Sequence, residues 1–141
     1  MPSVRAMHHV AMVTNDLDAT KRFYCDFMGG KVVVEGHLFH WATGQCFIAL
    51  GEGSMLEFFE FPDIETPDWT SMFLDDEMPK AGRLLEHVAY YVDTAEELAS
   101  WREKVKDAGM KFHSPEGRDV IFFPDPNNAT VQIIVGQPGT R

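Results

Sequence analysis

Two histidines occupy equivalent positions in two similar stretches of the chain. His9-Val10-Ala11 recurs later as His87-Val88-Ala89. Each copy is followed by a short apolar segment that carries one residue able to ligate a metal, Glu57 in Leu56-Glu57-Phe58-Phe59 and Gln132 in Val131-Gln132-Ile133-Ile134. Imidazole nitrogens together with carboxylate and amide oxygens suit a divalent cation. Because a duplication puts equivalent residues in equivalent places, these four side chains are expected to meet at one point if the two halves pack face to face.

A purely structural role is the alternative for each of these residues. A lone histidine on an apolar strand is usually a packed core residue, but two histidines at repeat-equivalent positions favour a shared function. Glu57 lies within the apolar run 56–61, where a carboxylate without a partner costs several kcal/mol to desolvate. Gln132 is the most ambiguous of the set, since backbone hydrogen bonds can satisfy its amide.

Composition and charge narrow the classes of partner. The chain has 141 residues, of which 45% are hydrophobic, which is enough for one domain with a real core. A net charge of −10 with only 12 Lys and Arg disfavours nucleic acid and anionic membranes as partners. We expect a small-molecule partner or a second copy of the chain. The two cysteines form no C-x-x-C, and no leader-like or membrane-spanning segment is present, so a cytoplasmic location is expected.

Hydrophobic periodicity and turn residues predict the same order of elements twice, a strand, a helix and three strands. In the first repeat the expected elements are a strand with two buried faces at Met7–Val13, a helix at about 16–28, and strands at about Lys31–Glu35, Gln45–Leu50 and Met55–Phe61. In the second they are a strand at Glu86–Val92, a helix that begins with the capping box Thr94 to Glu97 and ends at Gly109, and strands near Met110–His113, Asp119–Phe123 and Thr130–Val135.

The fold class that follows is α+β, with two tandem β-α-β-β-β modules. Module one spans about residues 5–61 and module two about residues 85–136. The intervening residues 62–84 carry three prolines, many acids and an apolar cluster at 69–74. We expect this segment to pack as a lid or as a subunit contact.

Strand alternation places further side chains on the same face as the candidate ligands. The expected pocket wall is apolar and aromatic, and Arg118 is placed where it could reach a substrate carboxylate or carbonyl. The residues expected to line the substrate pocket are Val13, Phe47, Phe59, Phe61, Tyr91, Phe122 and Ile134.

Nearly the whole chain resembles the vicinal oxygen chelate superfamily, which groups glyoxalases, bleomycin resistance proteins and extradiol dioxygenases. The motifs that carry the resemblance are His9-Val10-Ala11 leading to Asn15-Asp16-Leu17 and Arg22-Phe23-Tyr24, the segment 56–62, His87-Val88-Ala89 leading to Asp93, and Phe123-Pro124-Asp125-Pro126-Asn127. The resemblance implies a single glyoxalase-like domain over residues 1–141, whose curved mixed sheets enclose a cleft. It also implies one divalent metal, of Zn, Ni, Co, Mn or Fe(II), at the matching positions His9, Glu57, His87 and Gln132.

Two departures from the pattern of the superfamily bear on the chemistry. Gln132 stands where most relatives have a glutamate that serves as ligand and often as base, and an amide cannot take a proton. Val13 and Phe61 stand where relatives that act on glutathione adducts have an arginine and an asparagine. A glutathione substrate is therefore disfavoured.

The function expected from this pattern is that of a metal-dependent lyase or isomerase. Its metal would stabilise an enediolate on a small, largely hydrophobic, oxygen-bearing substrate, and Glu57 would be the catalytic base. The first alternative is an Fe(II) extradiol-type ring-cleavage dioxygenase. The second is a metal-free small-molecule binding or resistance protein. The resemblance and the apolar residues 69–74 also favour a homodimer, with the cleft within one chain or across two.

Overall fold

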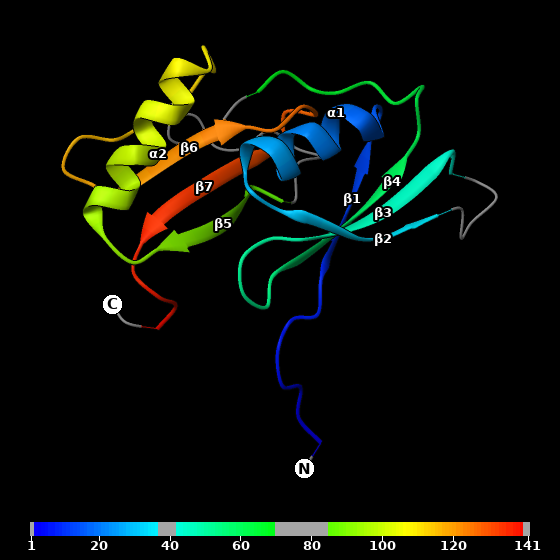
Figure 1. The fold of residues 1–141 in the computed structure, drawn as a ribbon, viewed down its shortest axis with the longest axis horizontal. Coiled ribbons are helices and arrows are strands. Elements are labelled where there is room, and N and C mark those ends of the chain that lie inside the picture. Colours follow the sequence, from blue (N-terminus) through cyan, green and yellow to red (C-terminus); the bar gives the residue numbers. More distant parts are fainter. Residues whose placement is uncertain (1, 37–41, 70–84, 140–141) are drawn as a thin grey trace. The chain divides into compact units, whose positions relative to one another are not determined.

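Each half of the chain folds into a small sheet with a helix against one face (Figure 1). The computed structural model describes residues 2–36, 42–69 and 85–139. The chain divides into two compact units, Met1–Thr66 and Pro67–Arg141. None of the helices in the described ranges is long and apolar enough to cross a membrane.

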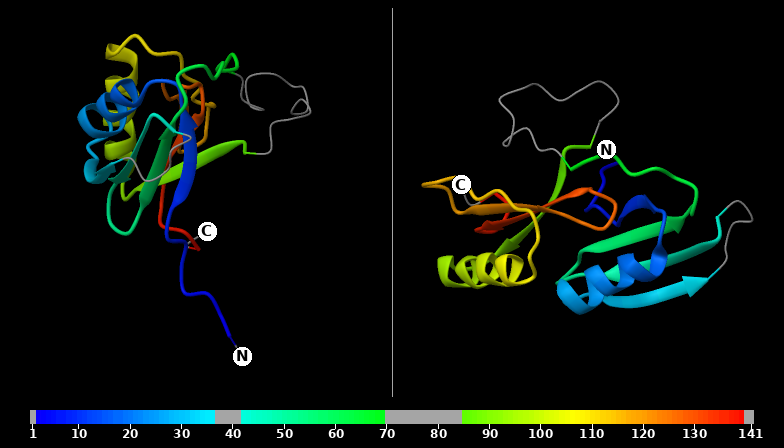
Figure 2. Two further views of the ribbon diagram at one scale, coloured as in Figure 1. Left: turned by 90° about the vertical axis from the view of Figure 1, so that its right-hand side faces the viewer. Right: turned by 90° about the horizontal axis from the view of Figure 1, so that it is seen from above.

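The first unit contains a four-stranded sheet in the order β1-β4-β3-β2. Strands β1 and β4 run parallel, whereas β4 with β3 and β3 with β2 are antiparallel. Helix α1 continues into the π-helical turn η1, and together they cover one face of the sheet (Figure 2). The bounds are β1 (Val10–Thr14), α1 (Leu17–Lys21), η1 (Arg22–Phe27), β2 (Lys31–Gly36), β3 (Gly44–Ala49) and β4 (Met55–Glu60).

Local side-chain chemistry starts this helix and joins it to β1. Asp16 is the N-cap, and its Oδ1 accepts the backbone N–H of Ala19 at 2.9 Å. The hydroxyl groups of Thr14 and Thr20 lie 2.8 Å apart, and both residues are fully buried. The core of the unit lies between the helix and the sheet, where the Tyr24 ring packs on Phe58 with the ring centroids 5.0 Å apart.

The second unit repeats this arrangement with a three-stranded sheet in the order β5-β7-β6. The predicted capping box is present, since Thr94 Oγ1 accepts the N–H of Glu97 and Glu97 Oε2 accepts the N–H of Thr94. Leu98 and Val105, on the inner face of helix α2, are completely buried. The bounds are β5 (His87–Val92), α2 (Ala95–Asp107), β6 (Val120–Pro124) and β7 (Thr130–Val135).

The turn between β6 and β7 is held by a buried aspartate from the Phe123–Asn127 motif. Asp125 Oδ1 accepts the backbone N–H groups of Asn127 at 2.8 Å and of Ala129 at 2.9 Å. The turn thereby fixes the pairing of the two strands, in which Phe122 lies opposite Gln132.

Two predicted strands differ from the observed ones. The strand expected at Met110–His113 is reduced to a single bridge between His113 and Phe122. The pairing does not extend toward Met110, because the next hydrogen-bonded pair would be Lys111 with Pro124, and a proline has no N–H to donate. The first strand begins at Val10 instead of Met7, and its face with Val13, which is 45% exposed, is not buried, since α1 covers only the opposite face.

Pro67 and Trp69 of the segment 62–84 belong to the second unit and form hydrogen bonds within it. Asn128 Nδ2 donates to the carbonyl oxygen of Pro67 at 2.7 Å, and Trp69 Nε1 donates to Thr130 Oγ1 at 3.0 Å. Residues 70–84 lie outside the described part of the chain, so most of the expected apolar cluster at 69–74 does too. A role for this segment as a lid or a subunit contact stays a prediction.

The buried thiol of Cys46 is expected to make the fold sensitive to alkali. Burial raises the pKa of Cys46 from 9.0 to about 11. The folded chain therefore holds this proton more tightly than the unfolded chain does. The resulting stability is complete below pH 9, and up to about 3 kcal/mol is lost as the pH rises to 11. The free energy of unfolding, measured with urea, should fall less between about pH 8 and about pH 10.5 for Cys46→Ala than for wild type. Equal losses in the two proteins would contradict this account.

Candidate metal and substrate site

The two sheets place the candidate ligands at equivalent register positions. In the first unit Glu57 pairs with Ala11 on one side and with Phe47 on the other. In the second unit Gln132 pairs with Ala89 and with Phe122 in the same way. Each histidine lies two residues before the alanine of its row. Side chains alternate along a strand, so each histidine shares a sheet face with the carboxylate or amide of its own unit.

In the first unit the two candidate ligands are close together. His9 Nε2 lies 3.5 Å from Glu57 Oε1. The His9 ring packs edge-on against Phe47, with the centroids 5.4 Å apart, and its Nδ1 lies 2.8 Å from Nδ1 of His8. The Glu57 side chain is buried although it is a carboxylate, with 8% of its residue surface exposed. This arrangement brings one imidazole nitrogen and one carboxylate oxygen toward a common point.

Glu57 has a further partner that the sequence alone did not indicate. The amide of Gln45 is buried and donates through Nε2 to Glu57 Oε2. The Oε1 atom of Gln45 is also buried and has no hydrogen-bond partner among the described residues. The alternation of side chains along a strand could have indicated this partner. Gln45 lies two residues before Phe47 on an otherwise apolar strand, so the two side chains share a face.

In the second unit His87 packs against the same kind of neighbour. Its ring lies edge-on to Phe122 with the centroids 5.7 Å apart, and His113 stacks on that Phe122 ring at 6.3 Å. His87 Nδ1 is buried without a hydrogen-bond partner in the described ranges. Glu86 Oε1, the carboxylate oxygen nearest to it among the recorded ion pairs, is 3.9 Å away. A buried imidazole nitrogen that accepts no hydrogen bond is available to a ligand.

A pocket of about 500 Å³ in the second unit includes part of the predicted substrate wall. Gln132 lines it together with Phe122 and Ile134. Tyr91, which is opposite Ile134 on β5, is 47% exposed. The remaining lining residues are Pro115, Gly117, Arg118, Asp119, Val120 and Val135.

The other predicted wall residues lie in the first unit. Val13 and Phe59 are opposite each other in the β1-β4 pair, two residues beyond the pair of Ala11 with Glu57. Phe47 contacts His9, and Phe61 follows β4 with its N–H donated to the carbonyl of Thr14. Their role in binding a substrate stays a prediction.

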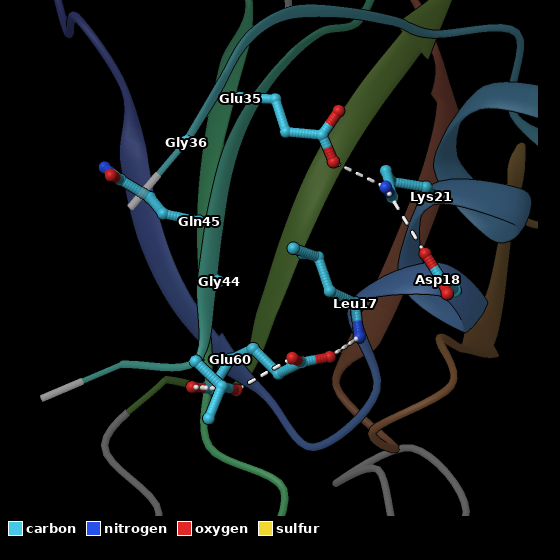
Figure 3. Close-up of a pocket in the computed structure, with 9 residues that line it drawn as sticks. Leu17, Asp18, Lys21, Glu35, Gly36, Gly44, Gln45 and Glu60 are labelled. Atoms are coloured by element: carbon cyan, nitrogen blue, oxygen red, sulfur yellow. Dashed lines mark hydrogen bonds and ion pairs between the residues drawn. The ribbon is translucent and has the colours of Figure 1, made fainter. Parts of the chain in front are cut away.

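A second pocket, on the helix side of the first sheet, is a weaker candidate (Figure 3). Its charged groups have partners among themselves, since Lys21 Nζ lies 2.6 Å from Glu35 and 3.3 Å from Asp18. The hydrogen bond to Glu35 raises the pKa of Lys21 above its ordinary value. Glu60 accepts from the N–H of Leu17 and the hydroxyl of Thr43. Figure 3 also shows the Gln45 side chain directed away from Leu17 and Lys21.

The family of the chain follows from comparison with known proteins. The model of the Glyoxalase/Bleomycin resistance protein/Dioxygenase superfamily matches residues 6–133. The chain belongs to this superfamily. Membership of the superfamily and the glyoxalase-like fold, both predicted from the sequence, are thereby confirmed.

Relatives within the superfamily include proteins of different kinds. Biphenyl-2,3-diol 1,2-dioxygenase 2 of Rhodococcus globerulus is 27% identical over 128 residues, which cover 89% of this chain but only 60% of that protein. The uncharacterized protein YwkD of Bacillus subtilis is 23% identical over 132 residues, covering 92% of this chain and 96% of YwkD.

Solved structures of the superfamily share the fold at low identity. A variant of the fosfomycin resistance protein FosX of Listeria monocytogenes, complexed with Mn(II) and 1S,2S-dihydroxypropylphosphonic acid, has a TM-score of 0.71 at 16% identity, covering 96% of both chains. A glyoxylase/bleomycin resistance protein/dioxygenase domain from Frankia sp. has a TM-score of 0.72 at 21% identity, covering 96% of this chain and all of that one.

The side chains present fit the divalent metal that the superfamily implies. Within each unit the donors are few, and no group of three or more His, Cys, Asp or Glu that could hold a metal occurs among the described residues. Each unit offers one histidine with either a carboxylate or an amide oxygen. The buried Nδ1 of His87, which has no hydrogen-bond partner among the described residues, is the observation that best fits a metal ligand. An imidazole with a carboxylate oxygen in the first unit, and an imidazole with an amide oxygen in the second, are donors of the kinds that a borderline transition metal takes.

Proposed function

We propose that this chain is a divalent-metal-dependent lyase or isomerase of the glyoxalase-like superfamily. The observation that carries the proposal is the equivalent placement of His9 with Glu57 and of His87 with Gln132 on the two sheets. The reaction proposed is proton abstraction from a carbon next to a substrate oxygen, with stabilisation of the resulting enediolate.

The residues proposed to hold the metal divide into three kinds. His9 and His87 supply neutral imidazole nitrogens, Gln132 supplies its amide oxygen, and Glu57 supplies a carboxylate oxygen. When bound, a divalent cation supplies Lewis-acid stabilisation of negative charge that develops on the substrate oxygens. The metal is proposed to be Zn, Ni, Co, Mn or Fe(II).

Glu57 is proposed to be the catalytic base as well as a ligand. Of the four proposed ligands it is the one that can take a proton from carbon, because an amide such as Gln132 cannot. Gln45 holds Glu57 Oε2, which leaves Oε1 as the oxygen near His9. This division of the two oxygens supports one role for each, since the held oxygen orients the carboxylate and the other is free to bind or to accept a proton.

The proposed substrate is a small and largely hydrophobic molecule with adjacent oxygens. The pocket in the second unit supports this in part, since Ile134 and the edges of Phe122 and Val120 lie beside the amide of Gln132 within a lining that is otherwise polar. Val13 and Phe61 lack the polar groups expected for a glutathione adduct. We also propose that residues 1–141 form a single glyoxalase-like domain that acts as a cytoplasmic homodimer.

Replacement of Glu57 by glutamine tests the proposed proton transfer. The variant keeps an oxygen ligand of the same shape but loses the proton acceptor. In D₂O, the rate at which the hydrogen next to the carbonyl of an α-hydroxyketone exchanges for deuterium should therefore fall by about 100-fold or more. Proton NMR of metal-loaded protein with a panel of α-hydroxyketones measures this rate, and metal analysis of the variant is the control. An unchanged rate in a variant with full metal content would contradict the proposal.

An Fe(II) ring-cleavage dioxygenase is the second candidate. It is supported by the 27% identity to a biphenyl-2,3-diol dioxygenase, of which this chain spans 60%. In that case Glu57 would supply the carboxylate that accompanies the two histidines on iron. Protein purified without air should then contain iron and consume oxygen when a catechol is added. Oxygen consumption that depends on a catechol is not expected of the lyase or isomerase, nor of a metal-free binding protein.

A further inference from the structure

Arg118 is a cation at the wall of the pocket that contains Gln132, and the proposed reaction gives it no role. The pocket of about 500 Å³ is lined by Arg118 together with Phe122 and Ile134. Arg118 precedes the first residue of β6, Val120, by two residues, and both line this pocket with Phe122. An apolar surface, an amide and a guanidinium therefore border one cavity.

The backbone that carries Arg118 is fixed by its own hydrogen bonds. The N–H of Arg118 donates to the carbonyl of Pro115, which closes a β-turn with Gly117 at its third position. Gly117 has φ of +72°, as a type II turn requires at that position. The side chain of Arg102 donates to the carbonyl of Arg118 at 3.0 Å and to Ser114 Oγ at 2.8 Å. Hydrogen bonds therefore hold the turn that carries Arg118 in one conformation.

The guanidinium of Arg118 has no ion pair and no hydrogen bond among the described residues. The carboxylate of Asp119 lines the same pocket, and Glu116 lines an adjoining one, but neither forms an ion pair with Arg118. Arg118 is exposed, and in this chain of net charge −10 with 22 acids no carboxylate among the described residues forms an ion pair with it. A guanidinium offers paired N–H donors that match a carboxylate, phosphonate or phosphate group.

We propose that Arg118 binds the oxyanion of an acidic substrate, and that the apolar body of this substrate lies against Phe122 and Ile134. The substrate class is then a small organic acid whose anionic group is a carboxylate, phosphonate or phosphate. The identification of this ligand with the substrate rests on the proposed function. The anion site itself does not, since it requires no metal.

The test uses metal-free protein, so that the anion site is judged separately from the metal. Full-length ¹⁵N-labelled chain, stripped with EDTA and dialysed, is titrated with benzoate, phenylphosphonate and the neutral benzamide, and the amide resonances of Gln132 and Ile134 are followed. The variants are Arg118→Gln and Arg118→Lys, with Arg22→Gln as a control that makes the same charge change on a helix of the first unit.

The expected result is saturable binding of at least one anion by the wild type, with affinity lowered about tenfold or more in Arg118→Gln. Arg118→Lys should retain part of the affinity, Arg22→Gln should retain all of it, and benzamide should bind wild type and Arg118→Gln equally weakly. The tighter of the two anions identifies the preferred oxyanion. Equal affinity of wild type and Arg118→Gln for the anions would overturn the proposal, as would the lack of saturable binding of either anion. A metal-free chain that binds anions in this way would leave the inference standing even if the metal proposal failed.

Discussion

Replacing Gln45 with leucine is expected to lower the free energy of unfolding of the metal-free protein by about 3 kcal/mol. The Gln45 amide donates to Glu57 Oε2, and both side chains are buried. Leucine fills a similar volume but leaves the Glu57 carboxylate buried without this donor. Urea unfolding at neutral pH after removal of metal measures the change.

A double variant separates the loss of this hydrogen bond from simple damage to packing. Gln45→Leu/Glu57→Leu replaces both partners with apolar groups, and such pairs are often neutral or stabilising. The double variant should therefore be more stable than Gln45→Leu alone. If the changes in the free energy of unfolding caused by the two substitutions instead add, the hydrogen bond from Gln45 does not stabilise the Glu57 carboxylate. A second readout is metal affinity, which should fall about 10- to 100-fold in Gln45→Leu, as for other groups that orient a ligand.

Removing either His9 or His87 is expected to weaken the binding of Co(II) by at least about 100-fold, because loss of a ligand exceeds the loss of a group that only orients one. The two histidines have equivalent register positions and equivalent aromatic neighbours, so the two effects should be similar in size. Titration of the visible absorption of Co(II) measures affinity and stoichiometry together.

His113→Ala is the matched control for His87→Ala. Both histidines pack on the ring of Phe122, so both variants lose a similar ring contact. His113 is not among the proposed ligands, and its loss should leave Co(II) affinity nearly unchanged. One equivalent of Co(II) per wild-type chain, lost in both ligand variants, is the expected pattern. Two equivalents, with one lost in each variant, would contradict a shared site.

Strand parity explains why much of the candidate site was predictable from the sequence. Side chains on a strand repeat every two residues, so the spacing of His9, Ala11 and Val13 assigns them to one face without knowledge of the fold. The repeat then carried the same assignment to His87. The register pairs of Glu57 with Phe47 and of Gln132 with Phe122 agree with it.

Contacts across strands and loops were beyond this kind of inference. The hydrogen bond from Gln45 to Glu57 depends on the antiparallel register of β3 and β4, which no local pattern specifies. The turn that presents Arg118 is braced by Arg102 from helix α2, a contact of side chain with backbone across sixteen residues. The strand expected at Met110–His113 failed for a similar reason, because its pattern is present but the register puts Lys111 opposite Pro124, which has no N–H for the next hydrogen-bonded pair.

Elemental analysis of the wild-type chain, purified without a tag or a chelator, tests the metal proposal most directly. The account predicts about one equivalent of Zn, Ni, Co, Mn or Fe per chain, either as purified or after reconstitution. Iron with catechol-dependent oxygen consumption would favour the dioxygenase, and any other of these metals the proton-transfer enzyme. Metal-free protein, even after reconstitution with each of these ions, would contradict the account and favour a binding protein in which His9 and His87 are structural.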